Sequence, residues 1–225
     1  MKHFFRRVNR GIALGVVLLI GLAVFIWQDE ATFQKETPAI EHTVTSYLDA
    51  MSKINTFEPN LQKIGATMTK EQQTAKQQEI KKIIDQYWTE SNVRNGMPKS
   101  MLLEQVNQMV TKNSKGKGYI QKFTVRLNGT PTIKKTGPGS ASADVRYDVV
   151  MEYAGTPMYL LGEYADITSH FTGKEPSSDT KVDETRKRYT VNVQANAELE
   201  KIGGTWKLVT MNGGYGGSGE PVNID

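Results

Sequence analysis

An apolar run near the N-terminus constrains this chain more than any other feature. Residues 11–27 read GIALGVVLLIGLAVFIW and contain no charged side chain, and Asp29 and Glu30 follow at once. As an α-helix the run would extend about 25 Å, which is at the short end of what crosses the hydrocarbon core of a bilayer. The sequence therefore predicts one membrane-spanning helix over residues 11–27, with its side chains in contact with lipid.

The charges before this run predict its orientation. The segment of residues 1–10 contains four basic residues and no acidic one, namely Lys2, Arg6, Arg7 and Arg10. Lys and Arg close to the end of a membrane helix favour the cytoplasmic side. We therefore expect a short cytoplasmic tail and an extracytoplasmic C-terminal portion, in a single-pass protein of the cell membrane.

A cleaved secretory signal is the alternative interpretation of the same segment. The apolar part of a cleavable signal is typically 7–15 residues long and ends at a small-x-small site. Here the run is longer and ends in Phe25-Ile26-Trp27-Gln28, without a clear site of that kind. Trp27 would lie at the outer membrane interface, where its ring is favoured. These features favour a retained anchor over a cleaved signal.

The excess of basic charge is confined to the N-terminal tail. The chain has 28 Lys and Arg against 24 Asp and Glu, so setting aside the four basic residues of the tail leaves 24 of each sign. Net charge therefore gives no support for a nucleic-acid partner, and we expect none. The chain has no cysteine, which excludes disulfides, thiolate metal sites and a lipid-modified cysteine anchor.

The first half of the outer portion has the periodicity of helices. Residues 28–38 are polar and predict a stalk or a continuation of the anchor helix. Apolar residues three and four positions apart then predict helices over residues 40–54, 69–88 and 98–110. Thr69 and Gln72 have the spacing of a capping box at the start of the second helix, whose polar first half is expected to be exposed.

The second half alternates instead with a period of two. This alternation predicts strands over residues 119–127, 143–153, 189–199 and 205–211. Apolar residues lie on one face of each strand, as in an antiparallel sheet with one face on a core. Asn128-Gly129 predicts a turn, and Gly203-Gly204 predicts a hairpin. Helices followed by strands indicate one α+β domain over residues 39–211.

Two further segments do not follow this pattern. Residues 155–184 contain apolar residues followed by a polar loop, and are expected to form an elaboration between two long strands. Residues 212–225 are rich in glycine and are expected to form a flexible tail. A phosphate-binding loop is not expected there, because no Lys-Ser/Thr pair and no helix follow the glycines.

The order of elements and the closing sequence GGTWKLV at residues 203–209 resemble a nuclear-transport-factor-2-like domain, also called a cystatin-like cone. The resemblance covers about residues 40–211 and implies helices packed on one face of a curved antiparallel sheet. With a single anchor, the layout is similar to the bitopic assembly factors of type IV secretion and conjugation systems. That resemblance implies a scaffold that forms homo-oligomers and contacts other envelope or secretion-channel proteins.

Enzymatic residues are not evident in the sequence. The same fold hosts enzymes of the ketosteroid-isomerase kind, which hold an acid–base pair in an apolar pocket. His42 is expected to be exposed, and Asp166 and His170, four positions apart, are interpreted as a surface pair. Three histidines without a cysteine give no metal-ligand spacing. We therefore expect a protein that is not an enzyme, with no catalytic, cofactor-binding or metal-binding residues.

Aromatic residues supply the remaining candidate sites. One set forms a candidate interaction patch, because exposed aromatic side chains often anchor interfaces: Tyr159, Tyr164 and Phe171. A second set forms a candidate pocket lining or, alternatively, plain core: Tyr87, Trp88 and Trp206. The sequence thus predicts an extracytoplasmic scaffold, with a tethered ligand-binding or sensory domain as the alternative. An acid–base enzyme is a third and weaker hypothesis.

Overall fold

The computed structural model describes residues 10–90, 98–155, 160–161 and 182–225 of the chain. The chain divides into two units, Met1–Ala39 and Ile40–Asp225. Helix α1 (Arg10–Asn55) contributes residues 10–39 to the first unit and residues 40–55 to the second. Residues 28–38 therefore continue the anchor helix, which is one of the two alternatives that the sequence leaves open.

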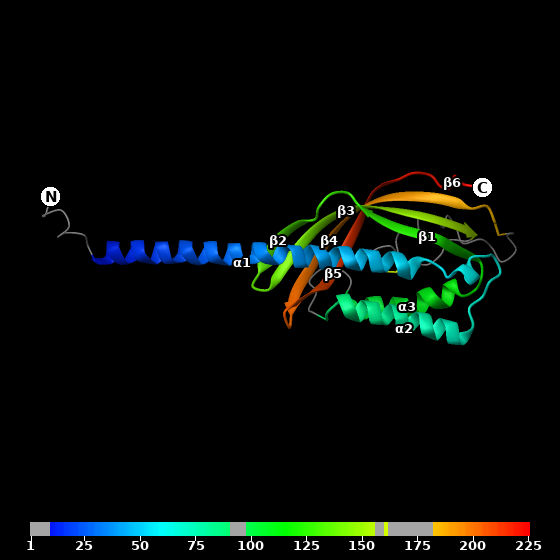
Figure 1. The fold of residues 1–225 in the computed structure, drawn as a ribbon, viewed down its shortest axis with the longest axis horizontal. Helices are drawn as coiled ribbons and strands as arrows, with labels where there is room; N and C mark the ends of the chain where they lie inside the picture. Colours follow the sequence, from blue (N-terminus) through cyan, green and yellow to red (C-terminus); the bar gives the residue numbers. More distant parts are fainter. Residues whose placement is uncertain (1–9, 91–97, 156–159, 162–181) are drawn as a thin grey trace. The chain divides into compact units, whose positions relative to one another are not determined.

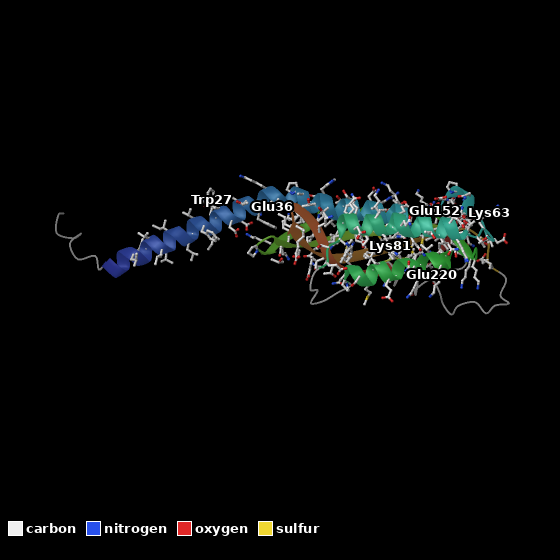
Figure 2. All side chains as sticks on the ribbon, turned by 90° about the horizontal axis from the view of Figure 1, so that it is seen from below. Trp27, Glu36, Lys63, Lys81, Glu152 and Glu220 are labelled. Atoms are coloured by element: carbon white, nitrogen blue, oxygen red, sulfur yellow. The ribbon has the colours of Figure 1, made fainter. Side chains whose placement is uncertain are left out.

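The apolar part of α1 exposes its side chains on every side. Leu14, Leu19 and Phe25 are 62%, 67% and 67% exposed, and Trp27 is 71% exposed. Figure 2 labels Trp27 on this helix. Among the described residues, one helix is long and apolar enough to span a membrane by length and composition, and it is this one. A helix that is apolar all round needs an apolar surrounding, and lipid supplies one.

The second unit begins with a layer of helices. After α1 come the 3₁₀ turn η2 (Pro59–Leu61) and the helices α2 (Lys70–Tyr87) and α3 (Lys99–Asn113). The capping box at the start of α2 is confirmed: Gln72 N donates to Thr69 Oγ1 at 3.3 Å, and Thr69 N donates to Gln72 Oε1 at 2.8 Å. Helices α2 and α3 lie side by side (Figure 1).

The sheet follows the helices along the chain. Its strands are β1 (Gly118–Leu127), β2 (Thr132–Gly137), β3 (Ser140–Gly155), β4 (Lys187–Ile202), β5 (Thr205–Ser218) and β6 (Val222–Asn223). The main order is β1-β3-β4-β5, with β2 also paired to β3 and β6 also paired to β4. Every one of these pairings is antiparallel. The long central strands β3 and β4 curve as they cross the domain (Figure 1).

One face of the sheet holds the core and the other is polar. Tyr147 of β3 lies opposite Val193 of β4, and both side chains are fully buried. On the opposite face Arg146 lies beside Gln194, and both are exposed. The predicted α+β class is thereby confirmed: an apolar N-terminal helix precedes helices and a curved antiparallel sheet. This arrangement is consistent with the cone that the resemblance implies.

The structure contains a strand, β2, that the sequence did not predict. Strands β1 and β2 pair with successive parts of β3, since Leu127 lies opposite Tyr147 and Thr132 lies opposite Asp144. Asn128-Gly129 therefore belongs to a short interruption between two strands on the same edge, where Gly129 has a φ of 94°. The tight hairpin in this region is the one that joins β2 to β3, after Gly137.

The flexible tail predicted for residues 212–225 is wrong in its first part. Strand β5 continues to Ser218, and Gly213 and Gly214 pair with Ala195 and Gln194 of β4. Farther on, Arg186 N donates to the Asp225 carboxylate at 2.8 Å. Backbone pairing does not depend on side chains, so a glycine-rich segment can complete a sheet edge when a long neighbouring strand offers partners.

Gly155, at the end of β3, is a position that only glycine fits. Its φ is +84°, and a Cβ there would collide with the backbone of Lys117 and Gly118. Gly129 has a similar φ of +94°, but a Cβ there would meet nothing within 4 Å. We expect Gly155→Ala to lower the free energy of unfolding by more than about 2 kcal/mol, against about 1 kcal/mol for Gly129→Ala. Denaturant unfolding of both variants measures this, and equal losses would contradict the collision.

Candidate functional site

Three aromatic rings meet where the helices approach the first residues of β5. Tyr47 of α1 is fully buried, and its ring contacts those of Tyr87, the last residue of α2, and Trp88. The ring centroids are 6.0 Å apart for Tyr47–Tyr87 and 5.7 Å apart for Tyr47–Trp88, with interplanar angles of 60° and 73°. Edge-to-face pairs of this kind are favourable beyond the area that they bury.

Backbone contacts hold this cluster against β5. Thr89 N donates to the Leu208 carbonyl at 2.8 Å, and Trp88 forms an isolated β-bridge with Leu208. Thr43 Oγ1 donates to the carbonyl of Trp206 at 3.5 Å. The side chains of Trp88 and Trp206 are only 3% and 4% exposed. The cluster therefore joins both helices to the sheet.

The predicted pocket-lining residues occupy different surroundings. Tyr87 is half-buried and lines an open groove of about 490 Å³ between α1 and α2, together with Asp49 and Lys53. Trp88 and Trp206 do not line that groove. Around Tyr47 the space between helices and sheet is occupied by rings of the protein itself. A ligand-binding role for Tyr87, Trp88 and Trp206 stays a prediction.

The candidate interaction patch lies outside the described residues. Tyr159, Tyr164 and Phe171 all belong to segments that the structure leaves undescribed, as do Asp166 and His170.

The histidine of α1 is the acid–base candidate that the structure does place. His42 is exposed, as expected, and its Nδ1 lies 3.4 Å from Ser46 Oγ on the next turn. This geometry places the imidazole in solvent rather than in an apolar pocket. Within the described part of the chain, no group of three His, Asp or Glu side chains is arranged to hold a metal ion.

Carboxylates of β3 form a cross-strand ladder on the polar face of the sheet. Asp144 Oδ1 accepts from Asn196 Nδ2 at 2.7 Å, and Asp148 Oδ1 accepts from Asn192 Nδ2 at 2.9 Å. Farther along, Glu152 Oε1 accepts from the Arg188 guanidinium. These acids lie on the face away from the core. Each is held by a side chain of β4, which fixes the register of the two strands.

A buried phenol lies at the far end of β3. Burial, and secondarily the nearby Tyr189 and Asp183, raise the pKa of Tyr153 to about 12. Hydrogen bonds from Lys187 and Thr185 lower the pKa of Asp183 to about 2. Both groups thus keep their ordinary charge at neutral pH, so neither exchanges a proton near pH 7.

This shift predicts a loss of stability in base. An unfolded tyrosine releases its proton near pH 10, whereas Tyr153 in the folded chain holds it until about 12. Between these values the unfolded state binds fewer protons, so the free energy of unfolding falls as pH rises. We expect Tyr153→Phe to make that fall shallower in denaturant midpoints between pH 9 and about 11.5. Tyr119→Phe, at a half-exposed residue of β1, serves as control; the same slope in Tyr153→Phe as in the parent would contradict the shift.

The first half of α2 is not fully exposed as expected. Gln72 and Lys76 are half-buried, and together with the exposed Ala75 and Glu79 they line a hollow beside the helix. These residues recur at i, i+3, i+4 and i+7, which is one face of a helix. The one sequence feature that indicates this partly buried face is Ala75, a small apolar residue within a polar stretch.

Comparisons with solved structures find matches at low sequence identity and low TM-score. A crystal structure of a candidate dehydratase of the NTF2-like family from Streptomyces avermitilis is 11% identical with a TM-score of 0.41, covering 80% of this chain and 95% of that one. A candidate calcium/calmodulin-dependent protein kinase II association domain from Xanthomonas campestris is 15% identical with a TM-score of 0.24, covering 76% and 80%. No protein-family model and no curated protein matches the sequence. The fold assignment therefore rests on the strand order and helical layer of this chain.

Proposed function

We propose that this chain is a membrane-anchored extracytoplasmic scaffold, an assembly subunit of an envelope complex. Within that class, a channel component of a conjugation or type IV secretion system is the specific proposal. The layout that supports it is a short basic tail, one apolar helix and one α+β domain. The observation that carries it is an apolar helix, exposed on all sides, that continues as one helix into a domain whose space around Tyr47, between helices and sheet, is occupied by aromatic rings of the chain itself.

The apolar helix supports the anchored part of the proposal. Its side chains from Leu14 to Trp27 are exposed on all sides, with none of the apolar window buried. A water-exposed stripe of this size is rare in soluble proteins and marks a membrane or protein contact. The basic residues before it favour a cytoplasmic N-terminus and, with it, an extracytoplasmic domain.

The packed space between the helices and the sheet around Tyr47 supports a structural role over a catalytic one. An acid–base enzyme of this fold needs a titratable group inside an apolar pocket. Around Tyr47 and Trp88 the corresponding space is filled by aromatic rings, and His42 lies in solvent. The described acids of β3 point to the polar face, where side chains of β4 hold them.

Affinity purification of the full-length chain in mild detergent tests this function. The proposal expects a membrane ATPase, a coupling protein or other channel subunits, identified by mass spectrometry, together with more than one copy of the chain. A control protein with residues 1–39 fused to an unrelated soluble domain removes partners that bind the anchor alone. Recovery of a monomer without partners would contradict the scaffold role.

A further inference from the structure

A hollow of about 170 Å³ lies within the helical layer of the domain. Its walls come from the end of α1, η2, the first half of α2 and the second half of α3. The apolar part of the wall is made by Ile54, Phe57, Leu61, Met68, Met109 and Val110. No strand residue lines it, so it is separate from the space around Tyr47 where the helices meet the sheet.

The segment that closes the hollow is fastened by its backbone. Phe57 N donates to the Ile120 carbonyl at 3.0 Å, Gly65 N to the Gly116 carbonyl at 2.8 Å, and Met68 N to the Ser114 carbonyl at 3.2 Å. These bonds tie residues 57–68 to β1 and to the residues after α3. The hollow is therefore a preformed feature of the domain, as binding pockets usually are.

The sequence of α2 explains why this space is empty of side chains. Ile80 and Ile84 are fully buried and form the apolar stripe in the second half of the helix. One and two turns earlier the same face carries Lys76, Ala75 and Gln72. No large apolar side chain of α2 thus reaches the apolar wall opposite. An apolar cavity of about 150 Å³ is large enough to bind a benzene ring.

Charged groups at the rim give the hollow a net charge. Glu58 and Glu79 contribute two carboxylates, and Lys76 contributes one ammonium group. Lys76 Nζ lies 3.1 Å from Glu79 Oε2, so its charge is largely matched by that carboxylate. Glu58 then gives the rim a net negative charge, which favours a cation over an anion of equal size.

We propose that this hollow binds a small molecule made of a single aromatic ring and an ammonium group. The ring fills the apolar space between Met109, Leu61 and Ile54, and the ammonium group lies at the rim near Glu58 and Glu79. Methionine side chains at Met68 and Met109 adapt to a ring and make favourable sulfur–aromatic contacts. This site is independent of the scaffold role. It shares Glu79 with the groove that Tyr87 lines, but Tyr87, Trp88 and Trp206 are not part of its lining.

Methyl NMR of the full-length chain in detergent tests the site, with phenethylammonium as the probe. The chain has nine methionines, and Met68→Leu and Met109→Leu assign the two signals that matter. We expect both signals to shift saturably with one common dissociation constant. Phenylacetate, which carries the same ring with a negative charge, is expected to bind about tenfold more weakly. Ethylammonium, which lacks the ring, is expected to leave both signals in place.

Variants of α2 locate the binding in the hollow. Ala75 is an exposed residue of the lining, so Ala75→Phe adds a ring at the hollow and is expected to abolish the saturable shifts. Gln78→Phe adds the same ring at an exposed position of the same helix outside the lining and is expected to leave the shifts unchanged. If circular dichroism shows that Ala75→Phe unfolds, Ala75→Leu repeats the test with less volume. No saturable shift at Met68 and Met109, or unchanged binding in the folded Ala75 variant, would overturn the site. Equal affinities for phenylacetate and phenethylammonium would contradict the preference for a cation that the rim charge predicts.

Discussion

Two lysines in the middle of the apolar helix are expected to release the protein from the membrane. Leu18 and Leu19 are 64% and 67% exposed, so both would face lipid in an inserted helix. Each lysine at the centre of a membrane helix costs about 2.5–3.5 kcal/mol on insertion scales. The Leu18→Lys/Leu19→Lys variant therefore loses about 5–7 kcal/mol of insertion free energy and is expected in the carbonate-soluble fraction.

A matched control separates membrane insertion from added charge. Gln28→Lys/Thr32→Lys adds the same two charges to exposed positions of α1 beyond the apolar run. This control is expected to stay in the carbonate-resistant membrane fraction with the parent chain. Carbonate resistance of the Leu18→Lys/Leu19→Lys variant would mean that the helix does not insert across the bilayer.

Tyr47→Ala is expected to have the largest effect on the stability of the domain. The Tyr47 side chain is fully buried and contacts the rings of Tyr87 and Trp88 from the helical side of the core. Removing a buried aromatic ring typically costs 3–5 kcal/mol, because the lost contacts leave a cavity. Since whole domains are stable by about 5–15 kcal/mol, this change is expected to lower the denaturant midpoint severely or to prevent folding.

Two further variants make this prediction specific to burial. Tyr119→Ala removes the same side chain from a half-exposed position on β1 and is expected to cost about 1 kcal/mol. Tyr47→Phe keeps the ring contacts and is expected to retain most of the stability. Denaturant unfolding in detergent, followed by tryptophan fluorescence, compares all three. Equal losses for Tyr47→Ala and Tyr119→Ala would contradict the packing described for the aromatic cluster.

Strong periodicity made much of the fold predictable from the sequence. The alternation from Ala143 to Tyr153 gave both the strand and the face that it buries, and the capping box at Thr69 gave the start of α2. Strand β2 has the sequence TIKKTG, in which only Ile133 is apolar, so no alternation marks it. Its position comes from pairing with β3 across the tight turn after Gly137, and the apolar pattern of β2 does not reveal that pairing.

The glycine-rich end and the hollow were also not predictable, because both depend on residues that only the fold brings together. Glycines at Gly213 and Gly214 indicate flexibility by composition, yet β4 supplies them with backbone partners that only the fold reveals. The hollow needs apolar residues from three helices and a small residue at Ala75 to meet in space. The aromatic residues Tyr87, Trp88 and Trp206 were found by their spacing, but spacing alone does not distinguish a pocket from a core.

Cysteine-directed crosslinking in intact cells tests the anchored scaffold most directly, because the parent chain has no cysteine. Gln194→Cys places one thiol at an exposed position on the polar face of the sheet, and Asn9→Cys places one in the N-terminal tail. With a membrane-impermeant thiol-reactive crosslinker, the account predicts that Gln194→Cys forms adducts with other envelope proteins in intact cells. Asn9→Cys is predicted to react only after the membrane is permeabilised. Reaction of Gln194→Cys only after permeabilisation, or its labelling without any protein adduct, would contradict the account.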